Sequence, residues 1–240
     1  MQLYRETIIN HALELLDAYG LADMTMRRVA SSLGVAAGAL YWHIANKQEL
    51  ITAVATKILT PVLVLDDESS PQEFCTKLRA TLLRHRDGAE LVHAASSQPH
   101  SPLWSQLCEL LARSIQQELV NEGLLPHNAH GAPGAPDPQI ADETAAEISA
   151  ATTSALHLIF GASIMEQSAK QLLEATQSAH KPRLPASAAA KPPGGLHSTE
   201  ATFRRVTDDV PRGITVLLAG LKTRLNNVNN DVNNQKGSLP

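Results

Sequence analysis

Apolar residues recur every three or four positions along most of the chain, the spacing that places them on one side of an α-helix. The first such run covers residues 6–19 and is followed by Gly20, a residue type that commonly ends helices. Further runs predict helices at 25–33, 35–44, 46–61, 72–84, 88–95, 102–122, 140–178 and 202–225. We therefore predict an all-α protein.

Several helix ends are marked by capping residues. Thr25 and Asn46 precede helical runs as N-caps, and Glu49 follows Asn46 at the spacing of a capping box. Gly34 can adopt the left-handed conformation of a tight turn. Pro61 predicts a kink or an end in the helix that contains it.

Three segments lack the composition of a packed element. Residues 124–138 are rich in Pro and Gly and predict a loop, and residues 180–197 are too poor in large apolar side chains to hold one conformation. The Asn-rich tail is expected to be disordered. We predict an amino-terminal head (1–46), a larger helical body (47–225) and the tail (226–240).

The composition restricts the classes of function. The 20 basic and 24 acidic side chains give a net charge of -4, so any contact with nucleic acid must be local. Cys75 and Cys108 stand in apolar helical settings as buried thiols, and neither a metal site nor a cofactor is expected. No stretch of about 18 uninterrupted apolar residues occurs, which favours a cytoplasmic protein without a membrane span.

Catalytic motifs are also missing from the sequence. It contains no G-x-S-x-G, P-loop, H-E-x-x-H or G-x-G-x-x-G pattern. The consecutive His85, Arg86 and Asp87 are interpreted as helix-end caps and charges. We do not expect an enzyme.

Two short helices joined by a turn at Gly34 form the pattern of a helix-turn-helix, in which the first helix braces the second in the major groove. Residues 24–50 closely resemble the DNA-binding head of the TetR family of transcriptional repressors. The matching residues include Leu40, Tyr41, Trp42, His43, Asn46 and Lys47. Residues 82–93, LLRHRDGAELVH, favour the tetracycline-repressor branch of that family.

The resemblance implies a homodimer that binds a palindromic double-stranded DNA operator and is released by a small-molecule inducer. A DNA-binding activator or regulator without an inducer is the alternative. The helices at 140–178 and 202–225 are the expected dimer interface. The helix from Asn46 to about Pro61 is the expected lever, because it alone joins the expected phosphate contact of Lys47 to the body.

Roles in DNA binding follow from the same resemblance. Arg27 matches an arginine that reads guanine, and Lys47 can hold a phosphate with the free N–H groups of its helix. Tyr41 can reach a phosphate, His43 is its neighbour, and Trp42 is assigned to the seam between head and body. The complete set is Thr25, Arg27, Arg28, Ala36, Ala37, Gly38, Ala39, Tyr41, Trp42, His43 and Lys47.

Structural alternatives remain for some of these residues. A lone exposed lysine such as Lys47 is often only solvated, but its place after the motif favours a phosphate contact. Tyr41 could also be a core aromatic ring whose hydroxyl reaches solvent, and Arg28 is either a phosphate contact or a surface charge. Trp42 and His43 also fit purely structural roles. Because residues 36–39 carry no hydrogen-bonding side chain, base readout is expected to rest on Arg27, backbone groups and DNA shape.

The predicted ligand site lies in the body. His93 and Glu166 match metal-ligand positions of the tetracycline-repressor branch, but Leu63 and Phe74 stand where polar groups are expected. This loss argues against a magnesium–tetracycline chelate as the inducer. His93 could also be an interior histidine whose ring nitrogens are hydrogen-bonded within the protein. The candidate ligand-binding residues are Leu63, Phe74, Leu78, His93, Gln98, Gln116 and Glu166.

Overall fold

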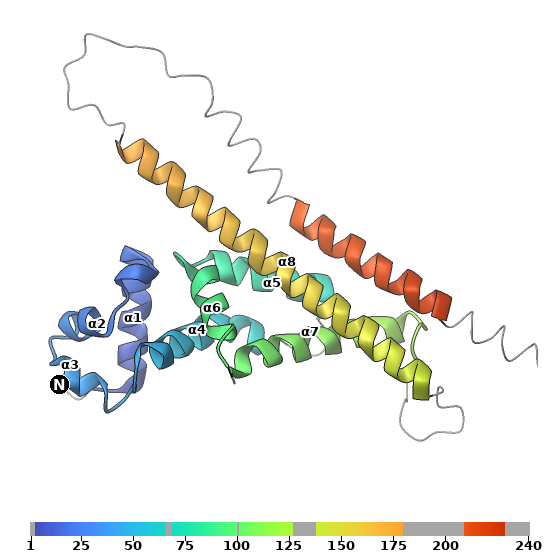
Figure 1. Cartoon of the computed structure of the whole chain (residues 1–240), viewed down its shortest axis with the longest axis horizontal. Coiled ribbons are helices and arrows are strands. Elements are labelled where there is room, and N and C mark those ends of the chain that lie inside the picture. The colour runs from blue at the N-terminus through green and yellow to red at the C-terminus, as the bar shows by residue number, and fades with distance from the viewer. Residues whose placement is uncertain (1–2, 66–68, 100, 127–137, 180–208, 229–240) are drawn as a thin grey trace, which may run out of the picture.

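The computed structural model describes residues 3–65, 69–99, 101–126, 138–179 and 209–228, and its regular elements are all helical (Figure 1). They are α1 (Arg5–Tyr19), the 3₁₀ turn η1 (Leu21–Asp23), α2 (Met26–Ser32), α3 (Ala37–Leu40), α4 (Lys47–Leu63), α5 (Pro71–Leu83), α6 (Gly88–Ser96), α7 (Pro102–Asn121) and α8 (Pro138–Ala179). A C-terminal helix follows, described over residues 209–228. The predicted all-α class is confirmed.

The head consists of α1, α2 and α3. Gly20 ends α1 at φ 86°, and its N–H bonds to the carbonyl of Leu16. Thr25 caps α2 as predicted, since its side chain accepts a hydrogen bond from the N–H of Arg28. Gly34 then takes a φ of 66°, which turns the chain into α3.

The predicted helix at 35–44 is wrong in length, because only Ala37–Leu40 is helical. Ala36 offers no side-chain cap and Gly38 weakens the helix from within. Beyond Leu40, the carbonyl of His43 accepts a hydrogen bond from the Arg5 side chain at 2.6 Å. The helix therefore gives way to a turn that leads directly into α4.

Helix α4 packs on α1 of the head and on α5 and α6 of the body (Figure 1). Asn46 caps it as predicted, with its side chain accepting from the N–H of Glu49. Pro61 does not end the helix, which continues to Leu63. Buried residues of head and body belong to one hydrophobic cluster, and α4 packs against both parts.

The body is built from α5 to α8 and the C-terminal helix. The C-terminal helix packs antiparallel along α8, since a Cβ built on Gly213 would touch Leu158 and Arg224 pairs with Glu147. Lys222 joins it to the end of α7 through ion pairs with Glu118 and Glu122. Its buried side chains are Val210, Ile214, Leu218, Leu221 and Leu225. This helix is therefore part of the core of a single chain.

The outer surface of these two helices carries exposed apolar side chains. Met165 and Leu172 lie seven residues apart on α8, and Val216 lies on the C-terminal helix. By length and mean hydropathy, residues 140–176 could also cross a membrane, but core helices of soluble proteins pass the same test. Here the inner side of α8 packs on α5, α6 and α7.

The remaining boundaries agree closely with the predicted helices. The C-terminal helix extends to residue 228 instead of 225, and its predicted start at 202 lies outside the described residues. The predicted mobile segment 180–197 and most of the loop 124–138 and the tail 226–240 also lie outside them.

Candidate DNA interface and ligand pocket

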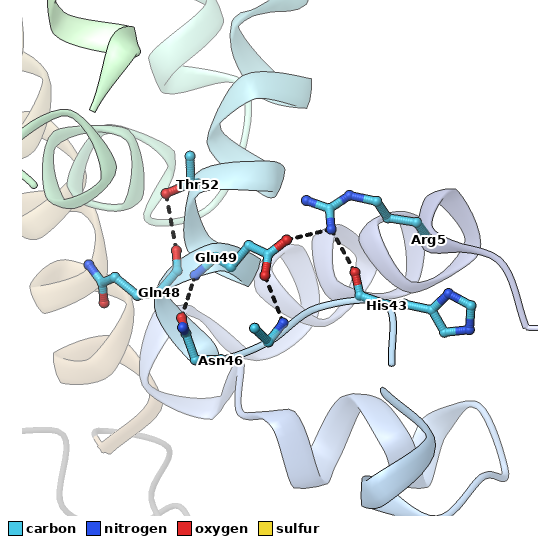
Figure 2. Close-up of polar contacts among 7 residues, drawn as sticks. Arg5, His43, Asn46, Gln48, Glu49 and Thr52 are labelled. Atoms are coloured by element: carbon cyan, nitrogen blue, oxygen red, sulfur yellow. Dashed lines mark hydrogen bonds and ion pairs between the residues drawn. The ribbon is translucent and has the colours of Figure 1, made fainter. Parts of the chain in front are cut away.

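The start of α4 is held in place by a small polar network (Figure 2). Asn46 Oδ1 accepts from the N–H of Glu49 at 2.8 Å, and Glu49 accepts in turn from the N–H of Ala45 at 2.7 Å. The Arg5 guanidinium donates to both Glu49, at 2.5 Å, and the His43 carbonyl. Head helix α1 is thereby tied to the residues that begin α4.

This network differs slightly from the predicted capping box, because Glu49 bonds to Ala45 and not to the Asn46 N–H. The Ala45 N–H, and after it the Arg5 side chain, lower the pKa of Glu49 below its ordinary value. Glu49 is therefore charged at neutral pH, and the contribution of its bonds to stability disappears only as the pH falls through this lowered pKa.

Most of the predicted DNA-binding residues are exposed. They are Arg27, Ala36, Ala37, Gly38, Tyr41, Trp42 and Lys47, while Thr25, Arg28, Ala39 and His43 are half-buried. A Cβ built on Gly38 would meet no atom within 4 Å, so the surface of α3 is open. The short helix is thus available to a large partner.

The two adjacent arginines of α2 differ in their surroundings. Arg27 projects into solvent, whereas Arg28 pairs with Asp23 and its guanidinium lies 4.0 Å from the centre of the Tyr19 ring. These contacts favour a structural role for Arg28 within the head. The DNA contact predicted for it stays a prediction.

The predicted position of Trp42 in the seam between head and body is wrong. Its side chain is 89% exposed, and buried Ile44 and Leu50 fill the adjoining core instead. The helical period did not reveal this, because α3 ends before Trp42 and the turn that follows directs the ring outward. An indole of this exposure is available at the same surface as Tyr41 and Lys47.

The turn between α5 and α6, residues Arg84–Asp87, connects the head to α8. In the head, Asp17 pairs with His85 at 3.0 Å and accepts from the N–H of Arg86. On the other side, Gln167 of α8 donates to the carbonyl of His85 at 2.7 Å. The turn is therefore a second connection between head and body, in addition to α4.

Asp87 strengthens the same connection. It has a left-handed φ of 53°, and its carboxylate accepts from the N–H of Leu21 at 2.7 Å and from the side chain of Gln171. Asp87 therefore does not cap α6 as expected but bonds across the fold. The HRDG motif marked this turn, but its partners Gln167 and Gln171 gave no sequence signal.

Replacing Asp87 by alanine is expected to free the Leu21 amide, whose acceptor is lost, and to lower the free energy of unfolding by about 1–2 kcal/mol. Asp87→Asn keeps a carbonyl oxygen and tolerates the left-handed backbone, so it serves as the control. Hydrogen exchange at Leu21 measures the effect directly. Unchanged protection of this amide in Asp87→Ala would contradict the assigned bond.

An aromatic pocket of about 220 Å³ opens in the body between α6, α7 and α8. It is lined by His93, Ser96, Ser97, Trp104, His157 and Phe160, and we call these residues the aromatic pocket. The Trp104 ring stacks on His157, with 5.2 Å between centroids. His93 meets Phe160 edge-on at 6.1 Å and is exposed, which rules out the interior histidine considered from the sequence.

The other predicted ligand residues do not gather around His93. Phe74 and Leu78 are buried in the core, Leu63 and Gln98 are half-buried, and Gln116 is exposed on α7. Glu166 lines a different cavity beside the α5–α6 turn and forms an ion pair with Arg79. His93 is therefore the one predicted residue that lies in the aromatic pocket.

No group of three metal-binding side chains occurs among the residues that the structure describes. Both cysteines are free thiols, and burial raises the pKa of Cys75 to about 12. The predicted absence of a metal site stays a prediction. At neutral pH the Cys75 thiol is therefore protonated and unreactive.

Sequence comparison gives one family match within the chain. Residues 8–54 match the model described as bacterial regulatory proteins, tetR family. The tetracycline repressor protein class D of Escherichia coli is 37% identical over 97 residues, which are 38% of this chain and 44% of that protein. The chain thus aligns with less than half of the length of this relative.

Solved structures extend the similarity over the body. BioQ of Mycobacterium smegmatis is 30% identical, with a TM-score of 0.60 over 92% of this chain and 99% of that one. A structure of BioQ with its natural double-stranded DNA operator is 34% identical, with a TM-score of 0.54 over 74% of this chain and 95% of that one. Head and body therefore both have a counterpart in one solved protein.

Proposed function

Because this chain belongs to the TetR family of bacterial regulatory proteins, a family of DNA-binding transcriptional regulators and not of enzymes, we propose that it is an inducible repressor. In this proposal a cytoplasmic homodimer binds a palindromic operator and is released by a small molecule. The observation that carries it is the open surface of α3 beside Lys47, at the start of the helix that enters the body.

The side chains of this surface support two kinds of DNA contact, one to phosphate and one to a base edge. Lys47 is the first residue of α4, where its ammonium group adds to the free N–H groups of the first turn and favours a phosphate. Arg27 is exposed on α2, and a guanidinium group can donate two hydrogen bonds to a guanine edge. Small side chains at 36–38 allow close approach of the α3 backbone to the groove.

Replacing Arg27 by alanine is expected to weaken binding to the operator by about 1–3 kcal/mol and to relax specificity at one base pair per half-site. The measurement is fluorescence anisotropy with operator and random duplexes. Equal losses on both duplexes would assign Arg27 to phosphate contact instead of base readout.

Replacing Lys47 by alanine is expected to weaken binding to operator and random duplexes alike and to reduce the slope of affinity against salt by about one. Lys77→Ala removes the same charge from an exposed site on α5 and is the matched control. A normal salt slope in Lys47→Ala would remove this residue from the phosphate contacts.

Two-fold symmetry is supported by the apolar outer side of α8 and the C-terminal helix. Met165, Leu172 and Val216 are each more than half exposed in a single chain. Large exposed apolar side chains in a row are typical of an interface, and a palindromic operator requires a symmetric protein. We therefore assign this surface to the homodimer.

Release by an inducer requires a path from the body to the head. Two connections support one, since α4 carries Lys47 directly and the α5–α6 turn joins α8 to Asp17 and Leu21. A change in α6 or α8 on ligand binding would thus shift both α4 and α1. Because polar partners at Leu63 and Phe74 are lacking, the inducer is expected not to need magnesium.

The proposal is tested by screening aromatic drugs and metabolites against a fluorescent operator complex with EDTA present. An inducer should raise the melting temperature of the protein and release the operator over the same concentration range. A compound that stabilises the protein without releasing DNA would favour the alternative, a regulator that needs no inducer.

A further inference from the structure

We propose that the aromatic pocket binds a flat ligand of one or two aromatic rings that carries a hydrogen-bond acceptor such as a carboxylate. This inference rests on the proposed function, because it names the chemical class of the inducer and the site that takes it. The pocket combines stacked rings, an unpartnered hydroxyl and an opening to solvent.

The rings favour a flat aromatic molecule. Trp104 and His157 stack with an interplanar angle of 25°, and Phe160 lies 6.2 Å from the Trp104 centroid, tilted by 39°. Offset or edge-on contacts between aromatic rings add binding free energy beyond that from the apolar area they bury. Three helices thus present aromatic surface to one cavity, and a saturated ligand would lose that gain.

The Ser96 hydroxyl favours an acceptor on the ligand. Ser96 is 7% exposed, and its Oγ has no hydrogen-bond partner although it is buried. Its neighbour Ser97 already donates to the carbonyl of His93 at 2.8 Å. Because a buried unpaired hydroxyl costs free energy, a ligand oxygen that accepts from Ser96 would recover it.

The charges that line the pocket and its volume restrict the class of ligand further. Among the described residues, the side chains that line the pocket include no carboxylate and no lysine or arginine, while the His93 and His157 rings can each donate an N–H. An acceptor is therefore preferred to a cationic group. A cavity of roughly 150 Å³ can hold benzene, so about 220 Å³ admits one or two rings.

The pocket is also reachable from solvent. His93 and His157 are exposed and Trp104 is half-buried, so the rings form a mouth and not a closed core. His93 lies on α6, which packs on α4, and Phe160 lies on α8, which carries Gln167. A ligand between these rings would therefore act on α6, which packs on α4, and on α8, which bonds to the α5–α6 turn.

Isothermal titration calorimetry of the full-length protein with 2-naphthoate, in EDTA, tests the inference. We expect binding at least tenfold tighter than that of cyclohexanecarboxylate, which keeps the acceptor but lacks the flat ring. Ser96→Ala should weaken binding about tenfold, which corresponds to one hydrogen bond. Ser105→Ala should not change it, because Ser105 is exposed on α7 outside the aromatic pocket and its hydroxyl already donates to the carbonyl of Pro102.

Equal affinities for the two acids, equal losses in the two serine variants, or no heat from 2-naphthoate at millimolar concentration would overturn the inference. Trp104→Leu gives a second test, with an expected loss of about tenfold and a folded state checked by circular dichroism. If 2-naphthoate binds as expected but the operator complex persists, the pocket is supported and release by its ligand is contradicted.

Discussion

Replacing both Met165 and Leu172 by glutamate is expected to convert the proposed dimer into monomers and to weaken operator binding by more than 100-fold. Met165 and Leu172 are 56% and 67% exposed in a single chain, and neither contributes to its core. In a two-fold interface the double variant would bury four carboxylates without partners, a cost of several kcal/mol. Sedimentation velocity and anisotropy with a palindromic duplex measure the two effects.

Val64→Glu is the matched control, because Val64 is 73% exposed but lies at the end of α4 and not on α8 or the C-terminal helix. It should remain dimeric and bind the operator normally. A dimer that survives both glutamates would exclude this surface from the interface. A simple truncation before residue 202 is less informative, because it also strips five buried side chains from the monomer core.

Gly88→Ala is expected to lower the free energy of unfolding by about 3 kcal/mol, or roughly 10 °C in melting temperature. A Cβ at this position would lie 2.6 Å from the carbonyl oxygen of Leu82 and 3.2 Å from the Cβ of His85. Since Gln167 also bonds to the Leu82 carbonyl, the backbone cannot move aside without breaking a second contact. Thermal and urea unfolding measure the loss.

The control is Gly38→Ala, which adds the same methyl group in α3 where nothing lies within 4 Å. It should leave stability unchanged or raise it by up to about 1 kcal/mol. Equal melting temperatures for the two variants would mean that the α5–α6 turn adapts freely. That result would also weaken the assignment of this turn as a connection between head and body.

Most of the helices could be predicted because their information is local. The starts of α2, α4 and α5 follow from single residues that cap them, and the apolar period defines their buried sides. Helix α3 is the exception, since Arg5 binds the carbonyl of His43, 38 residues away. No window of neighbouring residues contains that contact.

The residues of the candidate sites also divide into those that local sequence predicts and those that depend on contacts between distant parts of the chain. The exposure of Lys47 and Arg27 follows from their places on helices, whereas Trp42 lies in a turn whose direction the helical period does not define. The aromatic pocket combines residues from α6, α7 and α8, of which only His93 was predicted. Its partner Phe160 is 67 residues further along the chain, and no shared motif links the two.

The two tryptophans of the chain lie in very different surroundings, so intrinsic tryptophan fluorescence can report on two separate regions of the protein. Trp42 is open to water at the DNA-facing end, whereas Trp104 is stacked on His157 in the body. Indole emission depends on the polarity around the ring and on its contacts with other rings. A single Trp42→Phe substitution would therefore leave a fluorophore that responds to the aromatic pocket, and Trp104→Phe one that responds to the operator, without any added dye.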